Sequence, residues 1–208
     1  MITERPILLK HEMVRAILDG RKTQTRRAMK PQPEGGLDFT PFAPFGVVNG
    51  KGNPLICRHG QPGDRLWVRE TWQHLHNEGQ KADEFEQWQQ NSIDCFYLAD
   101  ESSPNNKPMS GRWRPSIHMP RWASRITLEI TDVRVERLQD ISAEDARAEG
   151  CLKPELPPEV RGVAGDFVAD ERTTFAILWN RINGPGSWAA NPWVWVIEFK
   201  RIPQEATQ

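Results

Sequence analysis

Hydrophobic alternation with a period of two residues limits most strongly the folds that this chain can adopt. Apolar side chains recur at every second position through residues 125–138, with one irregularity at Thr131 and Asp132. A second alternating run covers residues 194–201. This periodicity is typical of strands that hold one face against a core. We therefore expect two long strands, the first of them interrupted by a local irregularity.

Shorter elements complete a mixed pattern of helices and strands. Strands are also predicted over residues 64–71 and 94–99, and a hairpin within residues 31–63. Helices are predicted over residues 11–19, 142–148 and 173–182. Gly20 and Gly150 supply the ends of the first two helices. Because no βαβ unit repeats, this order favours an α+β fold with a mostly antiparallel, curved sheet in the form of a small barrel.

Length and composition are those of one globular domain that spans residues 1–208. Charged residues make up 26% of the chain and hydrophobic residues 38%, which excludes wholesale disorder. No run approaches the roughly 18 apolar residues of a membrane span, and no secretory signal is readable. With three widely spaced cysteines, the sequence predicts free thiols and a cytoplasmic location. Segments at about 73–112 and 153–172 are predicted to be loop insertions.

The net charge of −1 conceals two basic segments. Residues 112–125 contain four arginines and no acid, and residues 21–30 contain five basic residues and no acid. Trp122 stands between two arginines of the first segment, as an aromatic residue on a base-stacking surface would. The alternative is a solvated basic face with Trp122 packed at its edge. The segment is therefore a candidate nucleic-acid interface.

The densest polar motif is the segment 20–27, which follows the first helix. Lys22 and Thr25 stand three residues apart, so they face one site only if the chain bends between them. Nearby cations would lower the pKa of Lys22, and a neutral amine could then take the proton of the Thr25 hydroxyl. Glu149 and Glu70 are both candidates for the carboxylate that such chemistry needs. The alternative is a basic turn with solvated side chains.

Segment 20–26, the strand at 62–68 and the final strand at 195–199 together resemble the ASCH-domain family, which is related to PUA-like RNA-binding barrels. The residues that match the family motif, in its threonine variant, are Gly20, Lys22, Thr25 and Arg26. That variant is similar to the motif of small bacterial amidohydrolases that remove the acetyl group from N4-acetylcytidine. The chain as a whole looks most like longer, phage-associated members of the family.

The resemblance implies a catalytic set of Lys22, Thr25 and Glu149, because residues 142–149 are similar to the family's glutamate-bearing helix. The first hypothesis is therefore an amidohydrolase that deacylates an N4-acylated cytosine nucleoside, with Thr25 as nucleophile and Lys22 as general base. The second is a non-catalytic RNA- or DNA-binding module that recognises a modified base. Residues expected to bind substrate or nucleic acid are Arg21, Arg26, Arg69, Glu70, Arg114, His118, Met119, Arg121, Trp122 and Arg125.

No metal, cofactor or membrane contact is expected. A zinc site is conceivable at two pairs of residues, Cys57 with His59 and His74 with His76. However, the chain has no Cys-x-x-Cys pair, and a His-x-His pair needs a further ligand. A metal-dependent ribonuclease has less support, because no acidic cluster has convincing spacing. The expected partner is a modified nucleoside, RNA or DNA.

Overall fold

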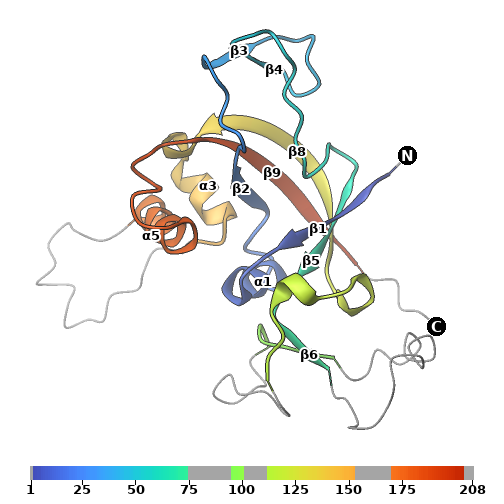
Figure 1. Cartoon of the computed structure of the whole chain (residues 1–208). Coiled ribbons are helices and arrows are strands. Elements are labelled where there is room, and N and C mark those ends of the chain that lie inside the picture. The colour runs from blue at the N-terminus through green and yellow to red at the C-terminus, as the bar shows by residue number, and fades with distance from the viewer. Residues whose placement is uncertain (1, 75–94, 101–111, 153–169, 204–208) are drawn as a thin grey trace, which may run out of the picture.

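The computed structural model describes residues 2–74, 95–100, 112–152 and 170–203. Within them, helices flank a curved sheet of five strands, which confirms the α+β class (Figure 1). The strands, in spatial order, are β1 (Glu4–Leu8), β5 (Arg65–Arg69), β8 (Thr127–Arg137), β9 (Trp193–Ile202) and β2 (Gln24–Ala28). β1 runs parallel to β5, whereas the other neighbouring strands are antiparallel.

Three α-helices lie in the described residues, close to where the sequence predicts them. They are α1 (His11–Leu18), α3 (Ala143–Ala148) and α5 (Glu171–Asn183). The Ser142 hydroxyl and the Asp170 carboxylate cap α3 and α5 by accepting hydrogen bonds from backbone N–H groups three residues on. The Asp170 cap explains why α5 begins two residues before its predicted start. None of these helices has the length and apolar character to cross a membrane.

β8 and β9 are the long strands that the alternation predicts, and they pair along most of their length. Their register shifts between Ile130 and Asp132, at the expected irregularity. Val194 of β9 packs in a cluster with α3 and α5, whereas the next residue, Trp195, packs in the larger core on the other face. β9 is therefore buried on both faces, because the two helices cover one of them.

Several short strands and 3₁₀ turns lie outside the five-stranded sheet. The predicted hairpin within residues 31–63 is confirmed and projects from one end of the sheet (Figure 1). The short strands are β3 (Leu37–Phe39), β4 (Val47–Asn49), β6 (Trp72–His74) and β7 (Cys95–Tyr97). Single 3₁₀ turns form at η4 (Ser116–His118), η5 (Arg121–Ala123) and η6 (Leu138–Asp140). Most of the two predicted insertions, residues 75–94, 101–111 and 153–169, lies outside the described residues.

The sheet does not close into the small barrel predicted from the sequence. β1 and β2 are its two edges, and they form no strand ladder with each other in the described residues. The connection between them runs through α1, which packs at the gap (Figure 1). A side-chain contact joins the two edge strands instead of a backbone ladder: Arg27 Nη2 of β2 donates a 2.7 Å hydrogen bond to the Leu8 carbonyl of β1. The result is an open, curved sheet with a seam between its edges.

Candidate active site

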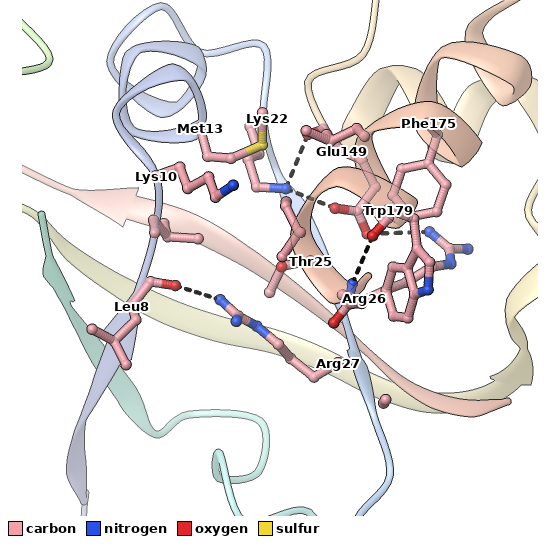
Figure 2. A pocket seen from close by; sticks show the side chains of 15 residues that line it. Leu8, Lys10, Met13, Lys22, Thr25, Arg26, Arg27, Glu149, Phe175 and Trp179 are labelled. Carbon is pink, nitrogen blue, oxygen red and sulfur yellow. Dashed lines mark hydrogen bonds and ion pairs between the residues drawn. The ribbon is translucent and has the colours of Figure 1, made fainter. Parts of the chain in front are cut away.

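A pocket of about 110 Å³ opens at this seam, between the end of β1, α1, β2 and α5 (Figure 2). Its polar wall is formed by Lys10, Lys22, Thr25, Arg26, Arg27 and Glu149. Met13, Phe175 and Trp179 supply apolar surface. The pocket therefore combines reactive polar groups with apolar and aromatic side chains, as small-molecule sites commonly do.

An ion pair at the inner end of the pocket is almost completely buried. Lys22 Nζ donates a hydrogen bond of 2.7 Å to Glu149 Oε2 and one of 2.9 Å to the Glu149 carbonyl. Only 1% of the Lys22 side chain and 5% of the Glu149 side chain are exposed. Burial lowers the pKa of Lys22, the charge of Glu149 opposes this shift, and Arg27 adds a smaller lowering. The direction is the predicted one, but burial is the main cause rather than the neighbouring cations.

Gly150 allows the Lys22 and Glu149 segments to meet. Lys22 and Glu149 form an isolated antiparallel bridge, so their backbones lie side by side. Gly150 follows Glu149 with φ of 88°, in the left-handed region. A Cβ at Gly150 would lie 2.9 Å from Ala16 Cβ and 3.3 Å from Lys22 Cβ. The end of α3 can therefore approach the lysine closely only with glycine at this position.

Thr25 lines the same pocket as the ion pair (Figure 2). Lys22 lies just ahead of β2, which begins at Gln24, and both side chains line the pocket although they are three residues apart. In the described residues, the Thr25 hydroxyl makes no hydrogen bond to Lys22 or Glu149. Contacts to a nucleophile are often long without substrate and shorten when it binds. Lys22 Nζ is therefore hydrogen-bonded to the Glu149 carboxylate, whereas it makes no hydrogen bond to the Thr25 hydroxyl in the described residues.

Arg26 lies at the centre of a network of acids. Its side chain is 0% exposed, and its terminal nitrogens lie 2.8 Å from Glu136, 2.8 Å from Asp145 and 3.5 Å from Glu149. Arg134 of β8 contacts Asp145 and Glu136 from the other side. Because three carboxylates surround the Arg26 guanidinium, this group orients Glu149 and the end of α3. Arg26 also lines the pocket, so its contact with substrate stays a prediction beside this structural role.

Arg27, the next residue, is placed very differently. In the described residues Arg27 has no carboxylate within ion-pair distance, and its Nε is buried without a partner. Burial lowers the pKa of Arg27, the charge of Glu149 opposes this, and Arg58 lowers it further. Arg27 is therefore a cation on the pocket wall that has no ion-pair partner among the described residues.

His59 lies near three arginines, Arg27, Arg58 and Arg5, and its environment predicts that stability depends on pH. Burial, followed by the charges of Arg27, Arg58 and Arg5, lowers the pKa of His59 to about 4. The unfolded chain, with a His pKa near 6.5, binds this proton more strongly between the two values. We therefore expect the free energy of unfolding to fall by about 1–3 kcal/mol as the pH drops from about 6.5 to about 4.

Urea unfolding of a His59→Gln variant at several pH values between 7 and 4 measures this contribution. The variant should lose that part of the pH dependence, because no proton binds at position 59 when the chain unfolds. The exposed His118 offers a matched control, and His118→Gln should keep the profile of the original protein. Identical pH profiles for the original protein and His59→Gln would contradict the lowered pKa.

Glu70, the other predicted acidic partner, lies away from the lysine. It does not line the pocket and accepts hydrogen bonds of 3.0 and 3.1 Å from Arg125. The Arg125 guanidinium also lies 3.9 Å from the centre of the Tyr97 ring. Burial raises the pKa of Glu70, and Arg125 opposes the shift. Of the two candidates, Glu149 is therefore the carboxylate beside Lys22, and Glu70 with Arg125 forms a separate buried pair.

The other predicted binding residues in and near segment 112–125 also lie outside the pocket lining. Trp122 packs edge-to-face on Trp72, with ring centres 5.7 Å apart, and Met119 is 1% exposed in the same cluster. The remaining residues are held by local contacts or lie at the surface: Arg69 bonds the Met119 carbonyl, Arg114 lies over Trp72, Arg121 pairs with Glu4, Arg21 pairs with Asp19, and His118 is exposed. Apart from Arg21, which also donates a hydrogen bond to the Gly150 carbonyl beside Glu149, these residues lie away from the catalytic candidates.

Sequence reasoning missed several residues at the site. Lys10 and Arg27 of the pocket wall were not predicted, nor were Asp145 and Glu136, which hold Arg26. Asp145 and Glu149 are four residues apart, so a helix brings them to one face, and this spacing could have indicated the acidic half of the network. No comparable local signal exists for Lys10, because it lies between β1 and α1 and reaches the pocket only through the tertiary arrangement of these elements.

The described residues contain no group of three or more His, Cys, Asp or Glu side chains that could hold a metal ion. Cys57 is buried and His59 half-buried, and both the His74 side chain and His76 lie outside what the structure describes.

Comparisons of the chain with family models, with curated proteins and with solved structures found no match. A functional conclusion must therefore depend on the chemistry of the pocket itself.

Proposed function

We propose that this protein is an amidohydrolase of the PUA-like ASCH type that deacylates an N4-acylated cytosine nucleoside. One observation carries the proposal: a buried amine–carboxylate pair, Lys22 and Glu149, shares an open pocket with the hydroxyl of Thr25. A buried lysine with a lowered pKa beside a candidate nucleophile is an arrangement that favours acyl transfer. Phe175 and Trp179 supply apolar surface against which a flat base can pack.

The pair can exchange protons without creating net charge. Lys22 and Glu149 share one proton, as ammonium and carboxylate or, once that proton passes from Nζ to Oε2, as amine and carboxylic acid. In that form, Thr25 Oγ1 attacks the acyl carbon while its proton passes to Lys22 Nζ. The ammonium so formed stabilises the oxyanion of the tetrahedral intermediate. Glu149 then gives its proton to N4 as the carbon–nitrogen bond breaks.

Water completes the cycle by attacking the acyl ester on Thr25. Glu149, now a carboxylate, takes a proton from the water, and Lys22 returns a proton to Thr25 Oγ1 as the ester bond breaks. The starting protonation states are restored, and the balance is one N4-acetylcytidine and one water converted to cytidine and acetic acid. Each of the three side chains therefore has a defined proton to hold or move.

The alternative, a non-catalytic RNA- or DNA-binding module, has weaker support. Its proposed stacking residue, Trp122, packs against Trp72, and Arg125 is engaged by Glu70 and Asp100. Arg114 remains exposed, so a phosphate contact there is the observation that favours this function. A module of this kind would bind nucleic acid without changing it.

Incubation of the purified full chain with N4-acetylcytidine tests the proposal. We expect equimolar cytidine and acetate, separated by liquid chromatography, at a rate proportional to protein concentration. N4-acetylcytidine recovered intact at high protein concentration, with RNA binding that weakens steeply with salt, would instead support the non-catalytic module.

A further inference from the structure

Two neighbouring arginines on β2 differ sharply in their electrostatic partners. Arg26 contacts three carboxylates, whereas Arg27 has none in the described residues and donates its hydrogen bond of 2.7 Å to a neutral carbonyl. The Nε atoms of both arginines are buried with no hydrogen-bond partner, so the two residues differ in the partners of their terminal nitrogens. Partial burial of a guanidinium that has no ion-pair partner costs free energy in the unliganded protein. A ligand with negative charge would remove this cost.

The charges of the pocket leave a positive surplus. Lys22 and Glu149 neutralise each other, and Glu136 and Asp145 together compensate Arg26 and Arg134. Arg27 and Lys10 then remain on the pocket wall without acidic partners in the part of the chain that the structure describes. In Figure 2 both side chains lie on the side of the pocket that carries Thr25. The pocket is therefore electropositive beside its candidate nucleophile.

From this arrangement we infer that the pocket takes a phosphorylated substrate, whose phosphate is held by the Arg27 guanidinium and the Lys10 ammonium. The inference rests on the proposed function, because phosphate is the anionic group that a cytosine nucleotide carries. The planar fork of an arginine matches phosphate oxygens, and a lysine adds a point charge.

The strand geometry allows one ligand to reach both groups. Thr25 and Arg27 are two residues apart on β2, so their side chains leave the same face of the strand about 7 Å apart. An acylated base at Thr25 and a phosphate at Arg27 are thus compatible with one bound nucleotide. The preferred substrate class is an N4-acylated cytidine phosphate, either a free 5′-monophosphate or a nucleotide within RNA, and the free nucleoside is bound less tightly.

Calorimetric titration with cytidine and with cytidine 5′-monophosphate tests the phosphate site without requiring turnover. We expect the monophosphate to bind about 10- to 100-fold more tightly than cytidine. An Arg27→Gln variant should lose most of this difference, so that it binds the monophosphate little more tightly than it binds cytidine. Arg27→Lys should retain part of it, because the charge remains while the fork is lost. Arg201→Gln, which removes an exposed arginine of β9, is the matched control and should bind both ligands as the original protein does.

A cytidylyl-cytidine dinucleotide without a terminal phosphate distinguishes the two phosphate sources. Tighter binding of the dinucleotide than of the monophosphate assigns the site to RNA, and the reverse order assigns it to a free nucleotide. Equal affinities of the original protein for cytidine and its monophosphate would overturn the inference. So would an Arg27→Gln variant, shown to be folded by circular dichroism, that lowers turnover of N4-acetylcytidine but leaves the affinity difference intact. Arg27-dependent phosphate binding without hydrolysis of any N4-acetylated ligand would retain the phosphate site and reject the amidohydrolase.

Discussion

A Thr25→Val variant should lose turnover of N4-acetylcytidine by a factor on the order of 10³ or more, because the attacking oxygen is replaced by a methyl group. Valine preserves the β-branched shape of threonine, so the pairing of β2 with β9 should persist. Thr25 is 5% exposed and makes no hydrogen bond in the described residues that the substitution would break. The free energy of unfolding should therefore change by less than about 1 kcal/mol.

The segment offers its own matched control in Thr23, which is exposed two residues earlier. Thr23→Val makes the same chemical change outside the pocket lining and should keep full turnover. Steady-state rates of both variants, together with thermal unfolding, separate loss of chemistry from loss of fold. Full activity of Thr25→Val would show that water attacks the acyl group directly or that the reaction occurs elsewhere.

A Lys22→Met variant should lose both turnover and stability. The Glu149 carboxylate would stay buried without its closest partner, which typically costs about 3–5 kcal/mol. Arg26, at 3.5 Å, would compensate only part of this charge. The loss should be larger at pH 8 than at pH 5, because an unpaired buried carboxyl has a raised pKa and takes up a proton as the pH falls.

A double variant, Lys22→Met with Glu149→Leu, separates the two effects. Removal of both charges should restore most of the free energy of unfolding, since replacing a buried ion pair by apolar side chains is often neutral or stabilising. Turnover should remain at least about 10²-fold below that of the original protein, because no general base is left. Urea unfolding and N4-acetylcytidine turnover measure the two quantities. A double variant with restored activity would remove Lys22 and Glu149 from the mechanism.

The identity of the acidic partner illustrates what spacing alone could not resolve. Glu149 and Glu70 are both carboxylates at the end of a regular element, and neither position indicates which one meets Lys22. The difference appears only when the isolated bridge brings the end of α3 to Lys22 and when Arg125 takes Glu70. The arginines are a similar case: Arg26 and Arg27 are adjacent in sequence, yet one is surrounded by acids and the other has none in the described residues.

The amino-acid sequence by itself determined the local elements: the long strands β8 and β9, the irregularity at residues 131–132, and the helices capped by Ser142 and Asp170. These features follow from side-chain period and from hydrogen bonds between residues close in the chain. Tertiary structure alone decided that β1 pairs in parallel with β5, that the sheet stays open at the β1–β2 seam, and that Lys22 is buried there. The physical reason is that desolvation and charge pairing depend on residues more than a hundred positions apart, whose meeting no local pattern encodes.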